Sequence, residues 1–244
     1  MHLIQDITFE KILKFLDQIK RVHKQNIPRL RLFIEAIYYV SRAGCQWRLL
    51  PYYYGKWRTV HKRFKAWSER GIWKKIFEIG KIDPDMELTM TDSTIVRAHA
   101  CSAGYTKYTQ PQEALGRSKG GFTTKIHAVV DALGNPLKFI LTPGQRNDIL
   151  SMGIDSEAMA GDKAYDANEY IDYLNNKGCT PAIPSRNNRK IPREYDEHIY
   201  KERNKIECFF GKIKHFRRVF SRYDKAARSY LSFIYFVSTL IWLR

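Results

Sequence analysis

The pattern of apolar residues changes once along the chain, and this change constrains the fold more than any other feature. Residues 1–80 place apolar side chains at helical spacing. The segment GKIDPDME that follows has no such period and contains a proline. From Leu88 onward the chain shows short runs rich in β-branched residues, which are typical of strands. We therefore expect a helical domain over 1–80, a linker over 81–87 and an α/β domain over 88–244.

The first domain should contain two short helices joined by a tight turn. One helix is expected to carry Val60, Phe64 and Trp67, and Gly71 then turns the chain into a second helix over 72–79. This small all-α arrangement is compatible with a helix-turn-helix element. The motif alone is a weak signal, because most short helix pairs bind nothing.

The second domain reads as a mixed sheet with helices on it. Strands are expected in LTMTDSTIV (88–96), on both sides of the turn LGNP, in EAMAGD and in TPAIP. Helices are expected after Asn147, in ANEYIDYLNNKG and, as one long helix, over 195–222. This order predicts an α/β fold with a mixed five-stranded sheet flanked by helices.

The charge of the chain favours a polyanionic partner. The net charge is +17 and the pI is near 9.7, and each phosphate that a basic side chain neutralises releases condensed counterions. Nucleic acid is the leading candidate. A polybasic membrane-surface protein is the alternative, but there is no lipidation signal and no apolar run long enough to span a bilayer. The run SFIYFVSTLIWL (232–243) is expected to be a buried terminal helix.

The cysteines indicate a reducing compartment. They are scattered without paired spacing, and no signal peptide precedes them; they are Cys45, Cys101, Cys179 and Cys208. We therefore expect reduced thiols, no zinc site and a cytoplasmic protein.

Two aspartates in the second domain lack a simple structural role. Asp131 lies in the turn DALGNP, and Asp166 with Glu169 looks like a capping pair at a helix start. Asp92 instead lies inside a strand, where a carboxylate is costly unless it is paired. Asp162 ends a buried strand, where active sites collect in α/β sheets. Phosphodiester chemistry on DNA is served by cations held by two or three such carboxylates.

A third carboxylate lies in YKERNKIECFFGKIK (200–214). On a single helix, Tyr200, Arg203, Glu207 and Lys214 would form one face. An apolar stripe beside it is expected to face the core, and it comprises Ile206, Phe209, Phe210, Ile213 and Phe220. Glu207 then stands at the border of the core, where both a functional carboxylate and an ordinary surface ion pair would fit.

The positions of Asp92, Asp162 and Glu207 resemble those of the RNase H-like fold, in which the first strand, the fourth strand and the last long helix bring three carboxylates together. The spacing within 200–214 matches the signature Y-(2)-R-(3)-E-(6)-K of DDE transposases from bacterial insertion sequences. With TDST, GRSKGGFTTKIH, LTPGQRND, DKAYD and FFGKIKHFRRVFSRYDK, the chain resembles the insertion-sequence 5 family. AGCQWRLLP and VHKRFKAWSERGIW resemble that family's amino-terminal domain.

The resemblance implies a transposase that cuts the ends of its element and joins them to target DNA. The three carboxylates would bind two Mg²⁺ or Mn²⁺ ions per active site. Tyr200, Arg203 and Lys214 would position terminal phosphates and bases. Without the carboxylates, these three residues would read as a solvated basic face.

The expected partner is double-stranded DNA, both the element's ends and its target, bound by a homodimer and without a membrane. Contacts with the terminal inverted repeats are expected from Arg48 and from the cluster His61, Lys62, Arg63 and Lys65.

Two alternatives stay open. The chain could be another RNase H-like endonuclease that uses the same carboxylates. It could also be a degraded copy that binds DNA without cutting it, because the stretch from Asp148 to Asp162 is shorter than its counterpart in the family.

Overall fold

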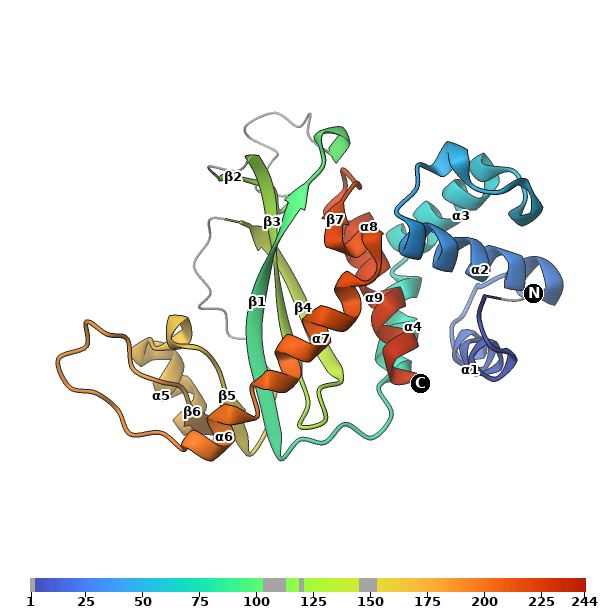
Figure 1. The fold of residues 1–244 in the computed structure, drawn as a ribbon. Helices are drawn as coiled ribbons and strands as arrows, with labels where there is room; N and C mark the ends of the chain where they lie inside the picture. The colour runs from blue at the N-terminus through green and yellow to red at the C-terminus, as the bar shows by residue number, and fades with distance from the viewer. Residues whose placement is uncertain (1–2, 103–112, 119–120, 145–152) are drawn as a thin grey trace. The chain divides into compact units, whose positions relative to one another are not determined.

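In the computed structural model of the protein, the regular elements of the first 80 residues are helices, and the first strand begins at Leu88 (Figure 1). The structure describes residues 3–102, 113–118, 121–144 and 153–244. The chain forms two compact units. Unit 1 comprises Met1–Ile82, Arg97–Glu113 and Ile213–Arg244, and unit 2 comprises Asp83–Val96 and Ala114–Lys212. The units cut the chain differently from the predicted domains, whose bounds 1–80, 81–87 and 88–244 stay a prediction.

Unit 1 is built mainly from helices. They are α1 (Asp6–Asp17), α2 (Ile27–Ala43), α3 (Trp57–Glu69), α4 (Ile72–Gly80), α8 (Arg217–Phe220) and α9 (Ala227–Trp242), with 3-10 turns at Trp47–Leu49, Tyr52–Tyr54 and Ala100–Ser102. The predicted pair of helices joined at Gly71 is confirmed, and this glycine adopts the left-handed conformation, with φ 65°, that lets the chain reverse.

The terminal helix α9 completes the core of unit 1. Phe233 stacks on Phe64 of α3 with ring centroids 4.4 Å apart, and Phe236 packs edge-on to Trp73 of α4. These four side chains are buried, which confirms that the apolar run 232–243 belongs to a buried helix. Among the described residues, none of the helices has the length and apolar character needed to cross a membrane.

Unit 2 carries a mixed sheet. Its strands are β1 (Leu88–Ala98), whose last two residues lie in unit 1, β2 (Gly116–Ser118), β3 (Gly121–Val130), β4 (Pro136–Pro143), β5 (Ala158–Ala160) and β6 (Thr180–Ala182). The order is β2-β3-β1-β5-β6, with β4 paired to β3. The strands β2, β3 and β4 are antiparallel, whereas β1, β5 and β6 are parallel.

The mixed α/β architecture is confirmed, but the number of strands was predicted too low. The five expected strands are β1, β3, β4, β5 and β6. Over the residues that the structure describes, the sheet has seven strands, because the short strand β2 pairs with β3 and the two-residue β7 (Ser221–Arg222) pairs with the end of β1.

The prediction of one long helix over 195–222 was wrong. The segment forms α6 (Glu197–Lys201), α7 (Asn204–Lys214), α8 and β7. At the first break, the amides of Glu202 and Arg203 bond to carbonyls three residues earlier instead of four. Near residue 221, the pairing of β7 with β1 ends the helical conformation. Phe220 is 59% exposed there, although we expected it in the core.

The remaining helices lie on the sheet. The apolar face of α7 is buried as predicted, and Phe209 stacks on Phe139 of β4 at 5.8 Å. Helix α5 (Asn168–Asn176) packs against β6. It follows a short 3-10 turn, η4 (Lys163–Tyr165), which begins directly after Asp162. The start of the helix expected after Asn147 lies outside the described residues.

Candidate active site

The register of two parallel strands places Asp92 and Asp162 side by side. In the pairing of β1 with β5, Met90 lies opposite Ala160. Asp92 follows Met90 by two residues within β1, where residues two apart point to the same face, and Asp162 follows Ala160 by two residues just beyond β5. The charge of Asp162 acts on the Asp92 carboxyl, so the two side chains lie near each other. Asp162 has already left β5 and accepts a hydrogen bond at Oδ1 from the amide of Ala164, 2.9 Å away, as the cap of η4.

Arg203 joins the first carboxylate to the third. Its Nη1 lies 3.2 Å from Oδ2 of Asp92, and its Nη2 donates to Oε1 of Glu207 at 2.7 Å. The side chains of Arg203 and Asp92 are mostly buried, whereas Glu207 is 57% exposed. The break between α6 and α7 lies at Arg203, so this residue reaches β1 from a turn and not from a continuous helix.

The electrostatics of Asp92 show that the other two carboxylates act on it. Burial raises the pKa of the Asp92 carboxyl, the amide of Ser93 and the Arg203 guanidinium lower it, and the charges of Asp162 and Glu207 raise it further. The net pKa lies above its ordinary value. Burial lowers the pKa of Arg203, but the neighbouring carboxylates, Asp92 first, hold it above its usual range. The guanidinium therefore stays charged.

The donor set has the chemistry of a Mg²⁺ site, because hard divalent cations prefer carboxylate oxygens. Within the described parts of the chain, however, no three acidic, histidine or cysteine side chains are grouped so that they could hold a metal ion. The contacts of Asp92 and Glu207 explain why their oxygens are not grouped around a cation position in the free protein. Oδ1 of Asp92 bonds to the amide of Ser93, and Arg203 binds both Asp92 and Glu207. A side-chain cation thus balances the negative charge.

The predicted face of Tyr200, Arg203, Glu207 and Lys214 does not lie on one helix. Tyr200 belongs to α6, and its ring lies 5.9 Å from the guanidinium of Arg203. Lys214 is the last residue of α7 and is half-buried. Arg203 and Glu207 are four residues apart, and their side chains still pair although Arg203 lies in the turn directly before α7 and Glu207 lies in the first turn of that helix.

The residues expected to contact inverted repeats have different environments. Arg48 and Lys62 are exposed, and the exposed Lys65 lies 3.8 Å from Glu69. Arg63 is half-buried: its guanidinium stacks over the ring of Phe33 at 4.5 Å and donates to the carbonyl of His23. Burial lowers the pKa of Arg63. Lys62 is thus free to reach a phosphate in this structure, whereas Arg63 packs within unit 1.

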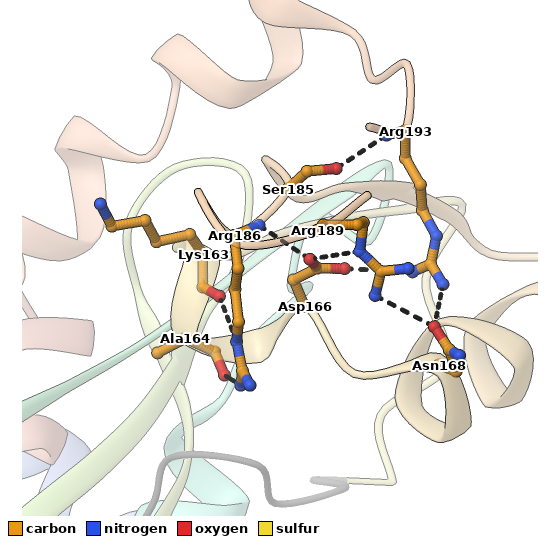
Figure 2. Close-up of polar contacts among 8 residues, drawn as sticks. All are labelled: Lys163, Ala164, Asp166, Asn168, Ser185, Arg186, Arg189 and Arg193. Atoms are coloured by element: carbon orange, nitrogen blue, oxygen red, sulfur yellow. Dashed lines mark hydrogen bonds and ion pairs between the residues drawn. The ribbon is translucent and has the colours of Figure 1, made fainter. Parts of the chain in front are cut away.

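A polar cluster beside the site was missed by sequence reasoning. The cap of α5 is Ala167 without a side-chain bond, so the expectation that Asp166 caps this helix was wrong. Instead, the Asp166 carboxylate binds Arg189 and Arg193 and the amide of Arg186 (Figure 2). The only sequence signal was the density of arginines in SRNNRKIPR, which names no partner.

Two family models match the chain. Residues 4–77 match the family described as "Putative transposase of IS4/5 family", and residues 83–240 match the family described as "Transposase DDE domain". The second match spans more than half of the chain and is an RNase H-like domain, which agrees with the mixed sheet of unit 2.

Two curated relatives agree with these matches. The chain is 36% identical over 129 residues to the "Putative transposase for insertion sequence element IS6501" of Brucella ovis, covering 50% of this chain and 99% of the relative. It is 34% identical over 101 residues to the "Uncharacterized protein y4sN" of Sinorhizobium fredii, covering 41% of this chain and 81% of the relative. No solved structure matches significantly. The side-by-side aspartates, the coupled glutamate and both family matches lead to one conclusion: the chain belongs to the DDE transposases of the IS4/5 type.

Proposed function

We propose that this transposase binds the terminal inverted repeats of its insertion sequence, cuts DNA at their 3′ ends and joins those ends to target DNA. The observation that carries the proposal is the shared register of Asp92 and Asp162, with Arg203 linking Asp92 to Glu207. A buried aspartate that feels the charges of two further carboxylates, in a chain of net charge +17, suits a site that handles phosphodiesters.

Asp92, Asp162 and Glu207 would together hold two Mg²⁺ or Mn²⁺ ions, which when bound would activate the attacking oxygen and stabilise charge on the phosphate. The protein's own residues would orient the DNA. Arg203 would exchange its carboxylate partners for a phosphate, because guanidinium groups bind both anions in the same bidentate geometry. Tyr200 and Lys214 would hold flanking nucleotides.

The amino-terminal helices would supply recognition of the repeats, with Lys62, Lys65 and Arg48 contacting phosphates. Because an element has two ends, we expect a homodimer on the DNA, working at the nucleoid in the bacterial cytoplasm. Light scattering of the complex with end DNA tests the stoichiometry.

A strand-cleavage assay tests the chemistry. Duplexes that carry the element's ends are incubated with Mg²⁺ or Mn²⁺ and the full chain. Asp92→Asn, Asp162→Asn and Glu207→Gln should each reduce cleavage by at least about 100-fold, since even outer partners of metal ligands are worth 10 to 100-fold. The control is Glu202→Gln, which changes an exposed acid that pairs with Lys205, and this variant should cleave normally.

The assay also separates the alternatives. A degraded copy would bind end DNA but never cut it, whatever ion is added. Another RNase H-like endonuclease would cut without needing inverted repeats and would yield no strand-transfer product. Loss of cleavage in the three variants with unchanged DNA binding would support the transposase.

A further inference from the structure

The segment between β6 and α6 contains a strongly basic loop. Residues 185–193 read SRNNRKIPR, with four cationic side chains and no acid. We call this segment the arginine loop. Its tip is open to solvent: Asn187, Asn188 and Lys190 are exposed, and Ile191 is 80% exposed. None of these residues takes part in the site described above.

One buried carboxylate orders the arginine loop. Oδ2 of Asp166 accepts from Nε of Arg189 and from the amide of Arg186, both at 2.8 Å, and its Oδ1 pairs with Nη1 of Arg193 at 3.3 Å (Figure 2). The Asp166 side chain is only 1% exposed. Charge-assisted bonds from both ends of the loop therefore meet at a single fixed point.

Further hydrogen bonds hold the side chains and the base of the loop in place. Oδ1 of Asn168 accepts from Arg189 at 3.0 Å and from Arg193 at 2.5 Å. The amide of Arg193 donates to Oγ of Ser185 at 2.7 Å, which closes the loop across its base. The loop is thus preorganised without regular secondary structure, so a ligand would meet a surface that is already ordered.

The arginine loop is also tied to the turn behind Asp162. Arg186 donates from Nε to the carbonyl of Lys163 at 3.2 Å and from Nη2 to that of Ala164 at 2.7 Å. Both carbonyls lie in η4, the turn that Asp162 caps. A molecule held by the loop therefore lies close to one carboxylate of the proposed catalytic site.

The charges of this cluster do not balance. The guanidinium groups of Arg189 and Arg193 pair with the single carboxylate of Asp166, and that of Arg186 binds only backbone carbonyls. The exposed Lys163 and Lys190 add two more positive charges. A purely structural clamp would need one arginine for one aspartate. An ordered surplus of cations raises the local potential and favours a polyanion.

We propose that the arginine loop is a second DNA-binding element that holds backbone phosphates next to the proposed cleavage site, with Asp166 as the positioning residue. The proposal rests on DNA being the substrate. Arg186, Lys163 and Lys190 would contact phosphates, which gives register and not sequence recognition. Arg189 and Arg193 would keep the loop in shape while adding to its potential.

A binding assay tests this proposal. The full chain is titrated onto a labelled duplex of about 30 base pairs and random sequence, and fluorescence anisotropy measures the affinity at several salt concentrations. Lys190→Gln should weaken binding several-fold near physiological salt and reduce the slope of log affinity against log salt by about one. Lys177→Gln is the matched control: it removes the same charge from unit 2 at the end of α5, and should change neither quantity.

The Asp166→Asn variant distinguishes a role of Asp166 in ordering the arginine loop from an effect of its charge on DNA binding. The variant makes the protein more positive, so a role in net charge alone would tighten binding. Loss of loop order should instead weaken it and should increase hydrogen exchange in 185–193. Unchanged affinity and slope for Lys190→Gln, or tighter binding by a folded Asp166→Asn, would overturn the proposal.

The two proposals can fail separately. If Lys190→Gln binds normally while Asp92→Asn abolishes cleavage, the arginine loop is not a DNA element and the transposase function stands. If the wild type never cleaves but Lys190→Gln loses one unit of salt slope, the loop proposal survives and the catalytic one fails.

Discussion

Arg203 lies 3.2 Å from Asp92, a residue more than one hundred positions earlier in the chain, and so anchors the turn before α7 to strand β1. The same guanidinium pairs with Glu207. Without it, the Asp92 carboxylate would stand beside Asp162 and Glu207 with only an amide to offset their repulsion. The contact therefore serves stability in the free protein as well as the proposed binding of phosphate.

Replacing Arg203 with glutamine should lower the free energy of unfolding by about 1–3 kcal/mol, because it removes a charge-assisted contact and leaves Asp92 partly buried without its cation. Urea unfolding of the free protein measures the loss.

A double-mutant cycle provides the control. Asp92→Asn in the Arg203→Gln background should restore part of the stability, since the unpaired charge is removed. Additive effects of the two changes would show that the ion pair contributes nothing.

Lys62→Gln and Arg63→Gln should have opposite signatures although the residues are adjacent. Lys62 is exposed, so its loss should weaken binding of end DNA and lower the salt slope by about one without moving the melting temperature. Arg63 packs on Phe33 and bonds to His23, so its loss should cost about 1 kcal/mol of stability. Calorimetry and anisotropy on both variants check this. A destabilised Lys62→Gln would contradict the assignment.

The clamp on Asp166 should open in acid. Burial would raise the pKa of this carboxyl, but bonds from Arg189 and the amide of Arg186, with the charges of Arg189 and Arg193, hold it below its usual value. Between the lowered pKa and the ordinary value of about 4, the unfolded chain binds more protons than the folded one. The stabilisation is therefore complete above about pH 4 and is lost as the pH falls below it.

Unfolding free energies of wild type and Asp166→Asn between pH 2 and 7 measure this linkage. The difference between the two proteins should be largest at neutral pH and should shrink below about pH 4. A difference that does not depend on pH would mean that the Asp166 charge is not the stabilising group.

Arg218 should be the most costly charged residue to replace in unit 1. It binds both carboxylate oxygens of Asp224 at 2.9 and 3.0 Å and donates to the carbonyl of Cys45, and both side chains are at most 10% exposed. Arg218→Met leaves a buried aspartate unpaired and should cost about 3–5 kcal/mol. Chemical unfolding tests this, and Arg218→Met with Asp224→Leu should recover most of the loss.

Local patterns in the sequence were enough to locate the five expected strands and the buried terminal helix. β-branched runs marked β1, β3 and β4, and the apolar run at 232–243 marked α9. Asp92 could be singled out because an acid inside a strand has few inexpensive explanations. Each of these inferences depends on residues that are neighbours in the sequence, or on burial, which local runs of apolar residues indicate well.

The failures involve partners that are distant in the chain. No local signal showed that β7 would pair with the end of β1, so the helix over 195–222 was drawn too long. Asp166 looked like a helix cap because its partners Arg189 and Arg193 lie more than twenty residues ahead. Helical periodicity also gave no sign of the turn at Arg203, where tertiary contacts override propensity.

The backbone ladder between β1 and β5 makes the proposed catalytic pair, Asp92 and Asp162, sensitive to chain length. Inserting or deleting one amino acid between Met90 and Asp92 would turn the Asp92 carboxylate to the opposite side of the sheet, even if every hydrogen bond of the ladder re-formed. Such a frame-preserving insertion or deletion would leave a folded protein in which the proposed catalytic carboxylates no longer lie together.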